Sequence, residues 1–126
     1  MVILDTNIII DHLRLRGSEK SYLRKLEEKF TKDLLAISIL TVQELYSGQS
    51  TKDSKNEDYL LSTIGPIQIL PYSYEIAELA GKISRDLQNP IDFADIAIAA
   101  TTMILGGRLS TLNKKHFKDI PNLELI

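Results

Sequence analysis

Four carboxylates stand next to apolar segments that are well separated along the chain. Asp5 ends the run MVIL, Glu44 follows the run LAISIL, and Asp92 and Asp95 lie within PIDFADIAIAA. Carboxylates gathered in one crevice repel each other, and a hard divalent cation such as Mg²⁺ or Mn²⁺ can hold them ionised together. The pattern therefore favours metal-assisted hydrolysis of a phosphodiester.

Each of these carboxylates also has a simpler structural explanation. Asp5 could cap the helix that follows it, and Glu44 forms the spacing of a capping box with Thr41, which by itself favours capping. Asp92 follows a proline and is most simply the N-cap of the next helix. For Asp95 the simpler explanation is a contact with the helix dipole, but it lies deeper, among apolar and small residues, where a carboxylate needs a partner, so its pattern favours a metal.

The elements that must position these side chains alternate along the chain. Short apolar runs predict strands at residues 1–4, 34–39 and 67–70, with weaker candidates at 108–111 and 123–126. Residues 49–58 are polar and predict a loop or the edge of a helix. Apolar positions at helical spacing predict three helical faces: Tyr22, Leu23, Leu26 and Phe30; Ile76, Ala80, Ile83 and Leu87; and Phe93, Ile96, Ala97, Ala100 and Ile104.

This alternation predicts an α/β fold with a mostly parallel sheet covered on both faces. Asp5 then lies at the carboxyl edge of the sheet, where open α/β sheets bind ligands. The first turn of the helix that carries Glu44 starts at the same edge, because that helix directly follows a buried strand. Glu44 can therefore be interpreted either as part of a capping box or as part of the metal site.

Composition narrows the classes of protein further. A chain of 126 residues with 44% hydrophobic content predicts one domain, residues 1–126. The absence of cysteine excludes thiolate zinc sites and cysteine nucleophiles. No run approaches the roughly 20 apolar residues that span a bilayer, so we expect no membrane association and a cytoplasmic location. A net charge of −2 argues against nucleic-acid binding by bulk attraction, so such a contact must be local or metal-mediated.

Other catalytic patterns are missing from the sequence. His12 and His116 have no zinc-ligand spacing, and a surface or packing role is the better interpretation of both. The glycines form neither G-x-x-x-x-G-K nor G-x-G-x-x-G, and there is no G-x-S-x-G elbow. Nucleotide binding of those kinds and serine catalysis are therefore not supported.

Three segments together resemble the PIN-domain ribonucleases, and in particular the VapC-like toxins of prokaryotic toxin–antitoxin pairs. They are LDTNIIID, ISILTVQELYSG and IDFADIAIAATTMILGGRLSTLNKKHF, which span nearly the whole chain. The resemblance implies a three-layer α/β/α sandwich and a catalytic, metal-binding set of Asp5, Glu44 and Asp95. A fourth family position, in a T-x-N/D segment, falls on Asn113, a neutral amide, so Asp92 is the alternative source of the missing charge.

The resemblance also implies the reaction and the partners. It implies cleavage of cellular RNA with Mg²⁺ or Mn²⁺, a homodimer, and a small antitoxin protein that neutralises the enzyme. Asp5 and Asp95 would hold the ion, and Glu44 would act directly or through a water. Residues expected to support the carboxylates or hold a phosphate are Thr6, Asn7, Thr111 and Asn113. The nearest basic patch for the RNA backbone is formed by Arg108, Lys114 and Lys115, and a solvated surface is an equal alternative for these three residues.

Apolar and aromatic residues exceed what a small domain needs in one region of the chain. This excess at Tyr46, Tyr59, Leu60 and Ile64 predicts either a surface that pairs with a second copy or packing on the domain's own sheet.

Three rival interpretations are weighed against the nuclease. A phosphoaspartate receiver also binds Mg²⁺ in an α/β fold, but the third predicted strand here ends in Leu70-Pro71-Tyr72 without an aspartate. A haloacid-dehalogenase-type phosphatase needs D-x-D, whereas this chain has Asp5-Thr6-Asn7. A PIN fold with weak or no catalysis that only binds RNA is opposed by the intact acidic set.

Overall fold

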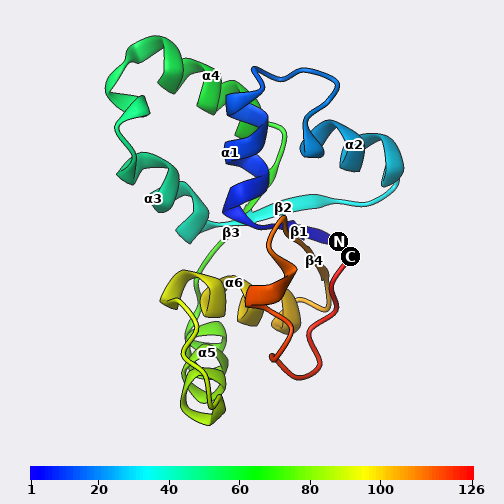
Figure 1. The fold of residues 1–126 in the computed structure, drawn as a ribbon, viewed down its shortest axis with the longest axis vertical. Helices are drawn as coiled ribbons and strands as arrows, with labels where there is room; N and C mark the ends of the chain where they lie inside the picture. Colours follow the sequence, from blue (N-terminus) through cyan, green and yellow to red (C-terminus); the bar gives the residue numbers. More distant parts are fainter.

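Four short parallel strands form the centre of the structure, a computed structural model that describes residues 1–126. The strands lie in the order β3-β2-β1-β4 and run parallel at every pairing. Helices cover both faces of this sheet, as Figure 1 shows, so the predicted three-layer α/β/α architecture is confirmed. The strand bounds are Val2–Leu4 (β1), Leu35–Ser38 (β2), Gln68–Leu70 (β3) and Arg108–Ser110 (β4).

Two hydrophobic cores form because side chains alternate across the strands. Val2, Leu4 and Ile37 face one core, and Ile3 and Ala36 face the other. The first core packs against α1 (Thr6–Arg14), α2 (Tyr22–Lys29), α3 (Ile39–Ser47) and α4 (Ser54–Ile64), and the second against α5 (Tyr74–Asp86) and α6 (Phe93–Ile104). Two 3₁₀ turns, η1 (Ser50–Lys52) and η2 (Lys114–His116), complete the elements.

The direction in which the chain adds strands to the sheet reverses between β1 and β4. From β1 it steps outward through β2 to β3, and then returns through α5 and α6 to β4 on the other side of β1. Such a switch point opens a crevice beyond the carboxyl ends of the two strands. Asp5 directly follows β1, and its amide donates to the carbonyl of Ser110 at the end of β4 (2.9 Å).

Several expected elements differ from the structure. Residues 123–126 form no strand, because only Leu125 bridges to Leu109. Residues 49–58, predicted as a loop or the edge of a helix, contain η1 and the first turn of α4, which begins where Asp53 caps it, so the helix-edge alternative is confirmed. Phe93 was expected on the buried face of α6 but is 75% exposed, since it occupies the first position of that helix.

Two of the four residues of the candidate association surface are interior, while Tyr59 is half-buried and Tyr46 is exposed. Leu60 and Ile64 are 1% and 6% exposed and belong to the core beneath α4, so self-packing is the correct interpretation for them. Tyr46 stays 40% exposed. Among all the helices, none combines the length and the apolar content that crossing a bilayer demands.

Candidate active site

Asp5 links the end of β1 to the end of β4. Its Oδ1 accepts from the amide of Thr6 (2.7 Å) and its Oδ2 accepts from the hydroxyl of Thr111 (2.7 Å). Asp5 is thus the N-cap of α1 and at the same time part of the crevice. Its side chain is only 5% exposed, and this burial raises its pKa against the lowering effect of the two hydrogen bonds.

The capping box predicted for Thr41 and Glu44 is wrong. α3 begins earlier, with Ser38 at the end of β2 as its N-cap, and the Ser38 hydroxyl accepts from the amide of Leu40 (3.1 Å). Thr41 is therefore a buried helical residue. Glu44 is free of any capping role, and its Oε1 accepts from the hydroxyl of Thr6 (2.7 Å), which also contacts the Thr41 hydroxyl (3.0 Å).

Asp92 and Asp95 lie at the start of α6. Asp92 occupies the predicted N-cap position, yet its side chain accepts no capping hydrogen bond. Asp95 lies in the first turn, with an 18% exposed side chain whose Oδ2 is 3.2 Å from Nδ1 of His116. Burial raises the pKa of Asp95, and the nearby charges of Asp5 and Asp92 raise it further. Asp5 is thus near enough for its charge to affect Asp95.

The carboxylates do not form a ready-made shell of three ligands. No group of three or more acidic, histidine or cysteine side chains is arranged to hold one ion. Three of the four carboxylates are instead held by separate hydrogen bonds: Asp5 by Thr111, Glu44 by Thr6 and Asp95 by His116. Mg²⁺ is commonly bound through one or two carboxylates with waters completing the shell, so the pair of Asp5 and Asp95 fits such an ion.

The small polar residues hold the segment that follows β4. The Asn7 amide nitrogen donates to the Thr111 hydroxyl (3.4 Å), and its oxygen accepts from the amide of Leu112 (3.3 Å). The backbone amide of Asn113 donates to the same hydroxyl (3.0 Å). The side-chain amide of Asn113 contacts Nε2 of His116 (2.9 Å) and no carboxylate.

His116 is the site residue that the sequence interpretation missed. The sequence predicts a surface or packing role for it, and the side chain is indeed exposed, but its ring also joins Asp95 to Asn113. The signal that could have revealed it is its position three residues after Asn113, which one 3₁₀ turn brings to the same side. His12, by contrast, has a packing role, as it is buried and bonds Ser21 (2.9 Å).

The expected basic patch divides in two. Arg108 lies at the opposite end of β4 from the crevice, where it contacts Asp33 (3.4 Å) and stacks over the ring of Phe30 (5.1 Å). Lys115 instead joins Asp92, Asp95 and His116 around a cleft of about 220 Å³.

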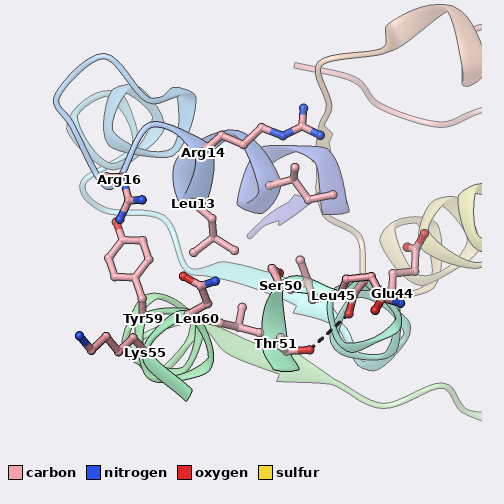
Figure 2. Close-up of a pocket in the computed structure, with 14 residues that line it drawn as sticks. Leu13, Arg14, Arg16, Glu44, Leu45, Ser50, Thr51, Lys55, Tyr59 and Leu60 are labelled. Carbon is pink, nitrogen blue, oxygen red and sulfur yellow. Dashed lines mark hydrogen bonds between the residues drawn. The ribbon is translucent and has the colours of Figure 1, made fainter. Parts of the chain in front are cut away.

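A larger cleft of about 650 Å³ has Glu44 among its lining residues. It lies between α1, α3, η1 and α4, and Figure 2 shows Glu44 at one end and Arg16 and Tyr59 at the other. Arg14, Arg16 and Lys55 are its basic residues. No sequence pattern indicated this group, because its members come from the end of α1, the following loop and α4.

The fold and the acidic crevice agree with the result of a comparison with protein families. The family model described as PIN domain matches residues 2–123. This chain belongs to the PIN domain family.

Several proteins that are similar to this chain carry the name ribonuclease. Ribonuclease VapC2 of Rickettsia felis is 30% identical over 127 residues, covering 97% of this chain and 93% of that protein. Ribonuclease VapC1 of Methanocaldococcus jannaschii is 33% identical, covering 98% and 84%. The crystal structure of VapBC2 from Rickettsia felis bound to a fragment of promoter DNA is similar over the whole chain and 98% of the other, with a TM-score of 0.88 at 29% identity.

A second solved structure has the same fold. DNA-bound VapBC from Salmonella typhimurium matches with a TM-score of 0.87 at 25% identity, over 99% of this chain and 96% of the other. The similarity thus extends over essentially all of both chains.

Proposed function

We propose that this protein is a divalent-metal-dependent endoribonuclease and the toxin of a toxin–antitoxin pair. The observation that carries the proposal is that the segment after β4 contacts both carboxylates beyond the switch point of the sheet, through Thr111 at Asp5 (2.7 Å) and His116 at Asp95 (3.2 Å). Both are buried enough to have raised pKa values, and the charge of Asp5 adds to that effect on Asp95. A cation between them would relieve this unfavourable burial and repulsion. Relatives of near-equal length that carry the name ribonuclease support the reaction class.

The chain's own residues divide the work in this proposal. Asp5 and Asp95 would hold Mg²⁺ or Mn²⁺, with Glu44 acting directly or through a water and Asp92 adding charge. When bound, the ion would stabilise charge on the phosphate and make a water more acidic. The side-chain amide of Asn113 is engaged by its contact with His116. This favours Asp92, rather than Asn113, as the fourth residue of the metal site.

The basic residues would guide the substrate. Arg14, Arg16 and Lys55 line the larger cleft that ends at Glu44, and Lys115 borders the smaller cleft at Asp95. RNA phosphates would contact these side chains on either side of the carboxylates. Such local contacts are compatible with the slightly negative net charge of −2.

The proposed biological setting comes from the relatives. Their solved structures include VapBC assemblies and a toxin–antitoxin complex from Klebsiella pneumoniae with a TM-score of 0.78 at 25% identity. We propose that an antitoxin protein restrains this chain in the same way, that the chain forms a homodimer, and that it acts on RNA in the cytoplasm.

The direct test is cleavage of structured RNA by the purified protein. We expect internal cleavage with Mg²⁺ or Mn²⁺, loss of cleavage in a chelator, and recovery when the ion is restored. Expression in a bacterial host should arrest growth for the same reason. Binding of RNA without cleavage under every metal condition would contradict the proposal and support a PIN fold that acts only as a binding module.

A second test addresses the hydroxyl that orients Glu44. Thr6→Val keeps the shape of the side chain but removes its hydrogen bonds to Glu44 and Thr41. We expect cleavage to fall about 10- to 100-fold, the usual effect of losing a residue that orients a metal-site carboxylate. Thr102→Val is the matched control, because its buried hydroxyl bonds only the carbonyl of Ile98 in α6. Equal rates for the two variants would show that the Thr6 hydroxyl does not position Glu44 for catalysis.

A further inference from the structure

We propose that Thr41 is a positioning residue for Glu44 and acts through the hydroxyl of Thr6. This role deepens the proposed function and rests on it, because Glu44 belongs to the proposed active site. The three side chains join α1, which begins at Thr6, to α3, which carries Thr41 and Glu44.

The hydrogen bonds of these three side chains have a definite direction. The Thr6 hydroxyl donates to Oε1 of Glu44 (2.7 Å) and lies 3.0 Å from the Thr41 hydroxyl. A hydroxyl has one proton to donate, whereas its oxygen has two lone pairs that accept. Because Thr6 gives its proton to Glu44, Thr41 must be the donor in the contact between the two threonines. The order of donation is therefore Thr41 to Thr6 to Glu44.

The Thr41 hydroxyl is committed to this contact. Thr41 is 0% exposed, and its hydroxyl makes no other hydrogen bond. A buried threonine in a helix often bonds back to the carbonyl four residues earlier, as Thr101 and Thr102 do in α6 (2.7 and 2.9 Å). Thr41 instead bonds across to α1. Since Ser38 caps α3, the hydroxyl of Thr41 has no capping role either.

Glu44 needs such support because it is an exposed residue. It lies three residues after Thr41, on the same side of α3, and a long side chain at the surface loses rotamer freedom when one position is imposed. Thr6 is by contrast 5% exposed, and its amide donates to Oδ1 of Asp5 (2.7 Å). Donation from Thr41 directs the Thr6 proton toward Glu44 and strengthens that second hydrogen bond. Thr6 thereby holds Glu44 in a fixed relation to Asp5.

The first experiment is a double-mutant cycle on stability in metal-free buffer. Thr6→Val removes the acceptor of the Thr41 hydroxyl and leaves this buried donor unpaired, which destabilises the protein. Thr41→Val leaves no donor unpaired, because Thr6 still donates to Glu44. We therefore expect Thr41→Val to raise the thermal midpoint by about 3 °C or more in the Thr6→Val background, and to change it much less in the wild type. Equal changes in the two backgrounds would overturn the coupling of the hydroxyls, whether or not the protein cleaves RNA.

The second experiment measures RNA cleavage by the same variants with Mg²⁺. Thr41→Val should lower kcat by about 10-fold, the lower end of the usual effect of losing a residue that orients a metal-site ligand. KM should stay unchanged, because the buried Thr41 side chain touches no RNA. Thr41→Ser keeps the hydroxyl and should retain the wild-type kcat, and Thr41→Val should cause no further loss in the Thr6→Val background. Thr101→Val, whose buried hydroxyl bonds only within α6, is the control.

Failure of the positioning role and failure of the nuclease are distinguishable. Three results would overturn the role of Thr41 and leave the nuclease intact: a wild-type kcat for Thr41→Val, an equal loss in both backgrounds, or a Thr41→Ser protein as impaired as Thr41→Val. Absence of cleavage by the wild type with every metal would instead overturn the proposed function, and the positioning role would fall with it. The stability cycle would still decide whether the two hydroxyls are coupled.

Discussion

Asp95→Asn is expected to abolish RNA cleavage while leaving the fold intact. The substitution keeps the size of the side chain and an oxygen that can accept from His116, but it removes one of the two charges that would hold the cation. A contribution of several kcal/mol from the ion corresponds to about 10²-fold or more in rate. Mn²⁺ affinity and the cleavage rate should fall together, and calorimetry with an RNA cleavage assay would measure both.

The same variant should be as stable as the wild type, or more stable, in metal-free buffer. Burial and the charges of Asp5 and Asp92 raise the folded-state pKa of Asp95 above its ordinary value of 3.8. The ionised group therefore lowers the free energy of unfolding at neutral pH. That penalty lessens as the pH falls through the raised pKa and is gone below the ordinary value, where Asp95 is protonated in both states. The Asn variant lacks the penalty at every pH.

We thus expect the variant's advantage in thermal midpoint to be largest near neutral pH and to vanish in acid. Asp58→Asn, on the exposed face of α4, removes the same charge away from the crevice and should change neither cleavage nor the pH profile. An Asp95→Asn protein that cleaves RNA at the wild-type rate would exclude Asp95 as a metal ligand.

Phe117→Ala is expected to produce the largest loss of stability. Phe117 is 1% exposed and packs in the core that α6 and the sheet share. Its truncation should lower the free energy of unfolding by about 3 to 5 kcal/mol, which urea denaturation would measure. Because Phe117 lies directly after η2, we also expect weaker Mn²⁺ binding at temperatures where the variant is still folded.

Leu112→Ala is the control for this substitution. Leu112 lies in the same segment but is 47% exposed, so its truncation should change stability by no more than about 0.5 kcal/mol. A Phe117→Ala protein that is folded and binds Mn²⁺ like the wild type would show that the crevice does not depend on this anchor.

The sequence by itself determined the type and order of the elements. Short apolar runs predicted the four strands, together with a fifth at residues 123–126 that does not form, and helical spacing predicted the faces of α2 and α5, because burial on one side of a helix imposes that spacing. The apolar run that ends at Asp5 also placed this residue at the edge of the sheet. The resemblance to the PIN family added the acidic set of Asp5, Glu44 and Asp95, and the family match over residues 2–123 confirms the membership but tests none of these roles.

Local patterns failed where one residue had two possible partners. Thr41 and Glu44 matched a capping box, but Ser38 caps α3 because the buried strand ends there and the helix starts at once. Spacing along the chain does not show which of two caps a helix uses. Glu44 consequently bonds Thr6, a residue far away in the sequence.

Only the tertiary structure decided which distant side chains meet. The return of the chain to β4 beside β1 brings Thr111 to Asp5, and the turn η2 then brings His116 to Asp95. The same packing sends Arg108 to the far end of its strand and joins Arg14 and Lys55 in a cleft with Glu44. These contacts join residues from separate elements, so they depend on strand order and packing, which no local periodicity specifies.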